Sequence, residues 1–142
     1  MRNSDPNEKP NKPTKAQRIK RFRDEQEREG AYEYRDRGRQ TVKLRQIVGS
    51  VNRYLDFDSK FRLKKDRPRE RLHTIRAIME KGKPLPPVDL YKIKDSYFVL
   101  DGNHRISVAK ERGFKEINAR VVEFFPSGAA AENVLYRAKT GF

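Results

Sequence analysis

Apolar and polar positions follow regular periods mainly between residues 41 and 125. Residues 41–48 alternate and predict a short strand with Val42, Leu44 and Ile47 in the core. Residues 49–68 lack a clear period and predict a loop. In residues 69–83, apolar side chains at helical spacing predict a helix that Gly82 and the following prolines end. These apolar positions are Leu72, Ile75, Ile78 and Met79.

The second half of the chain alternates between strand and helix patterns. Residues 87–93 and 96–101 predict two strands joined by a tight turn. A helix over 104–113, closed by a glycine, and a strand over 116–125 follow, and an alanine-rich segment at 129–139 predicts a final short helix. This order predicts an α/β or α+β fold with a small mixed sheet flanked by helices.

The first forty residues have a different character. Residues 1–13 are polar and proline-rich, so we expect a disordered basic tail. Residues 14–40 predict a polar helical arm, with Thr14 as N-cap and Gly30 as a candidate break. Its few apolar residues suggest that it lies loosely on the domain or docks on a partner. The expected units are therefore 1–13, 14–40, a domain at 41–125, and a C-terminal helix and tail at 126–142.

The net charge of the chain suggests what kind of partner it binds. Thirty-four Lys and Arg against twenty Asp and Glu leave a formal net charge of +14, which suggests an anionic ligand or polyanion, or simply a solvated basic surface. The arm holds candidate contacts to a nucleic-acid backbone, namely Lys15, Arg18, Lys20, Arg21 and Arg23. The chain has no cysteine, no apolar leader and no span of about 20 apolar residues, so we expect a cytoplasmic protein without membrane contact.

The candidate chemistry lies in the box Asp101-Gly102-Asn103-His104-Arg105, between a strand and a helix. A helix N-terminus binds anions, and a glycine lets the backbone approach them closely. Gly102, Asn103, His104 and Arg105 are therefore candidate phosphate contacts. Asp101 is a candidate magnesium ligand or base, and His104 a candidate proton carrier. The same five residues are also compatible with a structural role alone: a tight turn at Asp101-Gly102, a helix cap at Asn103, and solvated side chains at His104 and Arg105.

From residue 84 the text "PLPPVDLYKIKDSYFVLDGNHRISVAKERGFKEINARVV" resembles the ParB/sulfiredoxin superfamily, and the resemblance covers roughly residues 41–125. It implies an α+β fold of that type. Sulfiredoxins carry a catalytic cysteine just before the His-Arg pair, where this chain has Asn103. Without any cysteine, the thiol-based reduction of a sulfinic acid is excluded.

Two other branches of the superfamily imply nucleotide chemistry. In ParB partition proteins the box binds the triphosphate of CTP, and an upstream box, here "VNRYLDF", makes Arg53 a second cationic contact. These proteins also carry a helix-turn-helix domain, which we do not expect in the 17 residues after Phe125. Free-serine kinases of this fold carry an Asp-Gly-x-His-Arg box. That similarity implies that Asp101, His104 and Arg105 handle the phosphates of ATP or ADP and Mg²⁺.

The kinase branch also needs an acidic base, for which Asp56 and Asp58 lie in the right region without a clear alignment. A nuclease would need a cluster of carboxylates, which Asp101 and Asp56 alone do not provide.

Three functions remain open at this point. The favoured one is a ParB-like module that binds a nucleoside phosphate at the box and binds nucleic acid, such as DNA, non-specifically through its arm. The alternatives are a magnesium-dependent phosphotransferase or nucleotide hydrolase and a catalytically silent interaction domain. The resemblance is also compatible with a homodimer.

Overall fold

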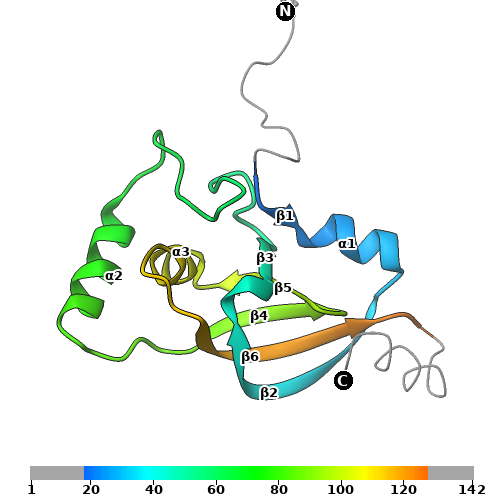
Figure 1. Ribbon diagram of the computed structural model, residues 1–142. Helices are drawn as coiled ribbons and strands as arrows, with labels where there is room; N and C mark the ends of the chain where they lie inside the picture. Colours follow the sequence, from blue (N-terminus) through cyan, green and yellow to red (C-terminus); the bar gives the residue numbers. More distant parts are fainter. Residues whose placement is uncertain (1–17, 128–142) are drawn as a thin grey trace, which may run out of the picture.

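The computed structural model describes residues 18–127 of the chain. A single mixed sheet, three helices and a short 3-10 turn make up this part (Figure 1). In chain order the elements are β1 (Lys20–Arg21), α1 (Phe22–Glu29), β2 (Glu33–Lys43), the 3-10 turn η2 (Leu44–Gln46), β3 (Ile47–Ser50), α2 (Glu70–Glu80), β4 (Val88–Ile93), β5 (Ser96–Asp101), α3 (Asn103–Glu111) and β6 (Glu116–Phe125).

The six strands of the sheet lie in the order β1-β3-β5-β4-β6-β2. The pairs β1/β3, β3/β5 and β4/β6 are parallel, whereas β4/β5 and β2/β6 are antiparallel. The fold is therefore α+β with a small mixed sheet, as the sequence pattern predicts. The tight turn between β4 and β5 and the glycine after α3 confirm the strand–strand–helix order of that region.

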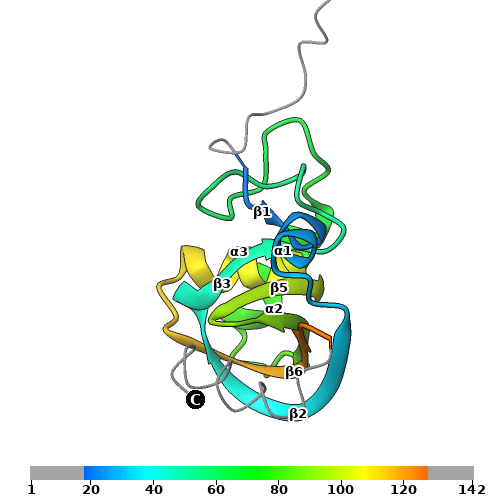
Figure 2. The same ribbon diagram turned by 90° about the vertical axis from the view of Figure 1, so that its right-hand side faces the viewer.

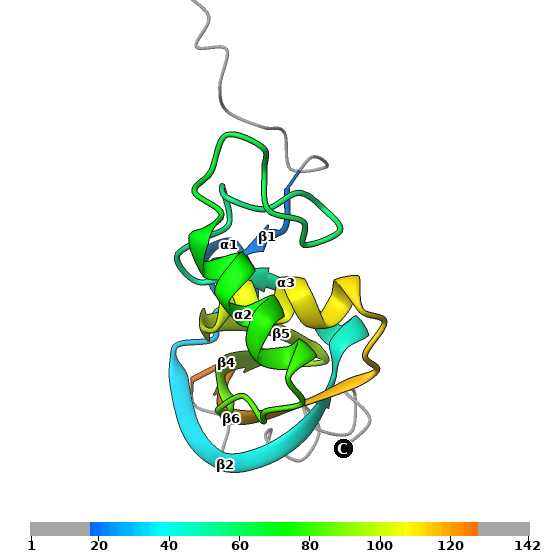
Figure 3. The ribbon, with the colours of Figure 1, turned by 90° about the vertical axis from the view of Figure 1, so that its left-hand side faces the viewer.

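Both faces of the sheet are covered, because apolar residues on neighbouring strand positions point to opposite sides. Along β4, Val88 and Leu90 join the core under α2, α3 and the loop after β3. Ile93 and the flanking Tyr91 instead join a second cluster with Phe22 of α1. Figure 2 shows α1 on the side that faces the viewer, whereas Figure 3, from the opposite side, shows α2 and α3 in front. Two cores thus fix the positions of all three helices.

The helical arm predicted across 14–40 is wrong for residues 18–21 and 30–40. Within the described part, α1 ends at Glu29, and the long strand β2 begins at Glu33 and crosses residue 40. Most β2 side chains are exposed on an edge strand, so the period-two alternation of a half-buried strand is missing and the polar residues suggested a helix.

The N-terminal segment is also more firmly packed than expected. Ile19 and Phe22 are 2 % and 5 % exposed, and β1 pairs with β3. The predicted loosely attached arm is therefore part of the sheet from residue 20 onward. A two-residue strand and one aromatic anchor are too short to produce a readable period in the sequence.

The strand predicted at 41–48 is divided in the structure. Lys43 ends β2, the 3-10 turn η2 follows, and β3 begins at Ile47. The predicted core positions Val42, Leu44 and Ile47 are all buried, so the apolar pattern was correct and the turn was missed. The tail at 1–13 and the helix at 129–139 lie outside the described residues. No helix between residues 18 and 127 is long and apolar enough to cross a membrane.

Candidate functional site

The box sits at a sharp transition from β5 to α3. Asp101 ends β5, Gly102 is the N-cap residue of α3, and the helix begins at Asn103. Gly102 has φ +109°, and a Cβ at this position would lie 2.6 Å from Cγ1 of Val88. Only glycine fits this corner without displacement. The backbone N–H groups of the first turn of α3 face outward from it, as at any helix N-terminus.

A cavity of about 150 Å³ opens at this corner, and we call it the junction cleft. Segments far apart in the sequence form it: the end of β5, the start of α3, the loop after β3 and the face of α2 that carries Ile75. Its lining residues are Asn52, Arg53, Arg71, Ile75, Leu100, Asp101, Gly102, Asn103, His104 and Arg105. The five residues of the box therefore share one cavity with the predicted upstream contact Arg53.

Ser50 anchors the loop that carries Arg53. This buried side chain donates a hydrogen bond from Oγ to the carbonyl oxygen of Val99 on β5, at 3.2 Å. Its Oγ also accepts a hydrogen bond from the backbone N–H of Arg53 at 3.0 Å. The parallel pairing of β3 with β5 thus fixes the loop beside the box. The Arg53 side chain is 51 % exposed and donates to Asp56 at 3.3 Å.

The second cation of the junction cleft is Arg71, which lies in the first turn of α2. Arg71 was not predicted as a site residue from the sequence. Its side chain is exposed, and no ion pair is recorded for it among residues 18–127. Arg71 and Ile75 are four residues apart and therefore share a helix face. That spacing was visible in the sequence, but which face of α2 meets the box depends on how α2 packs against α3.

His104 lies between this positive charge and an aromatic ring. Its imidazole makes an edge-to-face contact with Phe57, with the ring centres 5.6 Å apart. Burial lowers the pKa of His104 below 6.5, and the charges of Arg71 and Arg53 lower it further, against an opposing effect of Asp56. The imidazole is therefore neutral at pH 7, where it can donate one hydrogen bond and accept one.

Asn103 is the buried polar residue of the junction cleft. It is only 6 % exposed, and its Oδ1 is buried without a hydrogen-bond partner within the described part of the chain. The interpretation of Asn103 as a helix cap is wrong, because Gly102 occupies the N-cap position and α3 has no side-chain cap bond. A buried acceptor without a donor is uncommon in folded proteins and calls for a missing partner.

Arg105 makes internal contacts. Its Nη1 donates to the carbonyl oxygens of Pro86 at 2.7 Å and Pro87 at 3.1 Å, and its Nη2 donates to Oδ2 of Asp101 at 2.9 Å. Only 14 % of the side chain is exposed. Arg105 therefore ties the segment before β4 to the end of β5 and shapes the wall of the junction cleft.

Each of the carboxylates predicted for metal binding or base catalysis accepts a hydrogen bond from an arginine. Asp101 is 67 % exposed and accepts its hydrogen bond from Arg105. Asp56 accepts hydrogen bonds from Arg53 and Arg67, and Asp58 accepts from Arg62. No group of three or more His, Asp or Glu residues that could hold a metal ion occurs within residues 18–127. Asp101 is thus the carboxylate available at the cleft.

The predicted nucleic-acid contacts of the arm divide into two groups. Arg18 and Arg21 each place the guanidinium carbon 5.0 Å from the centre of the Tyr54 ring, and both lie within 4 Å of Asp24. Lys20 and Arg23 are more accessible, although Arg23 pairs with Glu27 at 3.2 Å. Lys15 lies outside the described residues. The first pair thus binds the arm to the domain, and the second is free to face solvent.

The chain is similar to a known protein family and, more distantly, to solved structures. Residues 40–135 match the family model described as ParB N-terminal domain. Sulfiredoxin from Arabidopsis thaliana aligns with a TM-score of 0.43 and 13% identity, over 58% of this chain and 82% of that one. A Pnob8-like ParB-N domain aligns with a TM-score of 0.43 and 15% identity, over 76% of this chain.

The chain spans only 35% of the length of that ParB-N structure. No curated protein matches the chain. The family model covers well over half of the sequence, including β3 to β6 and the whole box. The chain therefore belongs to the ParB N-terminal domain family.

Proposed function

We propose that the junction cleft binds the phosphate groups of a nucleoside triphosphate or diphosphate, with CTP, ATP and ADP as the candidate ligands. The observation that carries this proposal is the meeting of Arg53, Arg71 and His104 at the N-terminus of α3. Two guanidinium groups, a neutral imidazole and the unpaired N–H groups of a helix start are all donors. A phosphate presents only acceptors and negative charge, which matches this set.

The volume of the cleft indicates how such a ligand would lie. About 150 Å³ is well below the roughly 300 to 1,000 Å³ of sites that enclose whole small molecules. The phosphates would enter the cleft, whereas the ribose and base would lie at its mouth. Arg53 would turn from Asp56 toward the ligand, a small movement for a side chain that is half exposed.

The unpaired Oδ1 of Asn103 needs a donor rather than a phosphate oxygen. A sugar hydroxyl of the ligand or a water molecule bound to its metal ion would supply one. Mg²⁺ commonly binds through one or two carboxylates together with substrate phosphates, and the exposed Asp101 fits that role. The magnesium ion would neutralise phosphate charge, and the protein would contribute Asp101 and the orientation of the phosphates.

A phosphotransferase or nucleotide hydrolase remains the second candidate, and the exposed carboxylate of Asp101 at the cleft favours it. Binding alone does not require an acid at this place. A base would also have to accept a proton from a hydroxyl or water. Asp56, the nearest alternative, is held by two arginines, so the geometry favours binding over turnover.

The binding proposal is tested by calorimetric titration of ATP, ADP, CTP and GTP, each with Mg²⁺. At least one nucleotide should bind, and Arg53→Ala with Arg71→Ala should weaken it by about tenfold or more, because each removes a charged hydrogen bond. The matched control is Arg35→Ala with Arg39→Ala, which removes equal charge from exposed positions on β2. Equal losses in both double variants, or no binding to the folded chain, would refute the proposal.

Non-specific nucleic-acid binding by the arm is the second part of the proposal. Its support is the net charge of +14 and the exposed position of Lys20 and Arg23. Affinity for a duplex oligonucleotide should fall linearly on a log–log plot against salt. Replacement of Lys15, Lys20 and Arg23 by alanine should make that slope shallower. An unchanged slope would refute nucleic-acid binding by the arm, whereas the proposed nucleotide site would not be affected by that result.

A further inference from the structure

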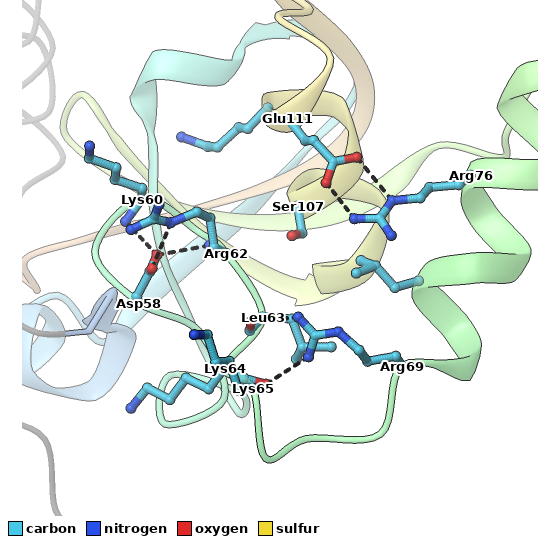
Figure 4. A pocket seen from close by; sticks show the side chains of 12 residues that line it. Asp58, Lys60, Arg62, Leu63, Lys64, Lys65, Arg69, Arg76, Ser107 and Glu111 are labelled. Carbon is cyan, nitrogen blue, oxygen red and sulfur yellow. Dashed lines mark hydrogen bonds and ion pairs between the residues drawn. The ribbon is translucent and has the colours of Figure 1, made fainter.

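A larger cavity lies between α2, α3 and the loop after β3. Its volume is about 570 Å³, and none of its lining residues belongs to the junction cleft. We call it the lysine groove (Figure 4). It is lined by Asp58, Lys60, Arg62, Leu63, Lys64, Lys65, Arg69, Leu72, Arg76, Ser107, Lys110 and Glu111.

The arginines of the lysine groove build its walls. Arg62 donates from Nε to Oδ2 of Asp58 at 2.8 Å, and Arg76 forms a two-bonded pair with Glu111. Arg69 donates to the carbonyl oxygens of Leu63 and Lys64 at 3.2 and 3.0 Å. Figure 4 shows these contacts along the rim. Both carboxylates of the groove are therefore already neutralised by arginines.

Asp58 also fixes the shape of the loop. Burial alone would raise the pKa of Asp58, but hydrogen bonds from Arg62 and from the backbone N–H of Lys60, together with the Arg62 charge, lower it. Its carboxylate holds a tight turn in which the buried Phe61 adopts φ +63°. The loop is thus rigidly built, and its lysines project from a defined scaffold.

The lysines, by contrast, carry uncompensated charge. No ion pair to Lys60, Lys64 or Lys65 is recorded within residues 18–127, and the first and last of these are exposed. Lys110 lies over the Phe61 ring at 5.6 Å, and burial lowers its pKa below the usual 10.5. Four lysines in one concave surface repel one another, and an anionic ligand would relieve that repulsion.

The floor of the groove is apolar and includes one hydroxyl. Leu63 and Leu72 belong to the main core, and Ser107 of α3 is only 7 % exposed. An apolar floor under a cationic rim suits a ligand that combines carboxylates with an apolar side chain. A peptide can provide both groups within a few residues.

Nucleic acid fits this groove less well than a peptide. The lining contains no aromatic side chain on which a base could stack, and its arginine forks are used internally.

We propose that the lysine groove binds an acidic peptide segment of a partner protein, with carboxylates on Lys60, Lys64 and Lys65 and an apolar side chain over Leu63 and Leu72. This site is independent of the nucleotide function, because it uses different residues and a different cavity. It also gives the chain a means of joining a larger assembly that does not depend on the arm.

The experiment uses a fluorescently labelled twelve-residue peptide that contains glutamates and two leucines, measured by fluorescence anisotropy with the full chain. Lys60→Glu with Lys64→Glu and Lys65→Glu should weaken binding by about tenfold or more, because three ion pairs to the peptide are lost and three repulsions replace them. The matched control is Arg35→Glu with Arg39→Glu and Lys43→Glu, which changes the net charge equally on exposed positions of β2. This control should change the affinity less than twofold.

Two further comparisons separate the groove from general charge attraction. Replacing the two peptide leucines by serine should weaken binding, and Arg53→Ala with Arg71→Ala should leave it unchanged. Equal loss in the groove and control variants would overturn the proposal in favour of non-specific attraction. Binding of a duplex oligonucleotide that depends on Lys60, Lys64 and Lys65, together with no binding of the peptide, would overturn it in favour of nucleic acid. Thermal unfolding of each variant checks that the fold is retained.

Discussion

The junction cleft and the lysine groove are lined by the same two helices but leave different cations without an ion pair among residues 18–127. Arg71 and Ile75 of α2 face the cleft, whereas Leu72 and Arg76, one residue further along, face the groove. In the cleft, Arg71 is exposed and forms no ion pair among residues 18–127, and Arg53, which is 51 % exposed, is paired with Asp56. In the groove, every arginine is bound to a carboxylate or a carbonyl, and lysines carry the remaining charge. The number of cations is therefore a weaker guide to a binding site than their existing partners.

Arg105 shows the same point within the box itself. The sequence predicted that Arg105 contacts a phosphate. In the structure its side-chain N–H groups instead donate hydrogen bonds to Pro86, Pro87 and Asp101. Its present role is to hold the corner at which the cleft opens. The cleft can thus be damaged in two ways: by removing its donors, or by removing the residues that shape it.

The largest effect is expected from Gly102→Ala. The new Cβ would collide with Val88 and adopt an unfavourable φ, which should lower the free energy of unfolding by about 2 to 4 kcal/mol. The matched control is Gly113→Ala. Gly113 also has a positive φ of +73°, but a Cβ at this position would meet no atom within 4 Å apart from its chain neighbours. This substitution should lower the free energy of unfolding by about 1 kcal/mol. Urea unfolding followed by circular dichroism measures both. Equal costs would mean that the corner has room for a side chain.

An intermediate effect is expected from Arg105→Ala. Removal of its charged hydrogen bonds leaves the two proline carbonyls without this donor and should cost about 2 kcal/mol of unfolding free energy. Arg53→Ala, at a half-exposed position, should cost less than about 0.5 kcal/mol. The same urea unfolding measures both variants. An Arg105→Ala protein of unchanged stability that no longer binds nucleotide would make Arg105 a ligand instead of a clamp.

The smallest effect concerns the pKa of His104, which should lie below 6.5 in the folded chain. Because the unfolded state then binds more protons, this group stabilises the fold fully above about pH 6.5, and that contribution is lost as the pH falls through the folded pKa. NMR titration should also show the pKa rising toward its ordinary value in Arg53→Ala with Arg71→Ala. A His104 pKa that stays the same in this variant would contradict the positive field assigned to the cleft.

Much of the fold could be predicted from local patterns. The strands β4, β5 and β6 and the helices α2 and α3 have clear periods and end at glycine or proline, so their types and approximate limits were predicted correctly. Polar edge strands and very short strands carry no such period, and β2 and β1 were therefore missed. The box was found because a glycine and donors followed directly after an apolar strand.

The sequence by itself determined that the chain has a mixed sheet, that a glycine corner precedes α3, and that cations greatly outnumber acids. These properties depend on neighbours in the chain. Only the tertiary structure decided that Arg71 faces the box, that Arg105 faces inward, and that a second cavity collects unpaired lysines. The reason is that a side chain's partner is set by how helices and loops pack on the sheet, and helical or strand periodicity alone does not specify that packing.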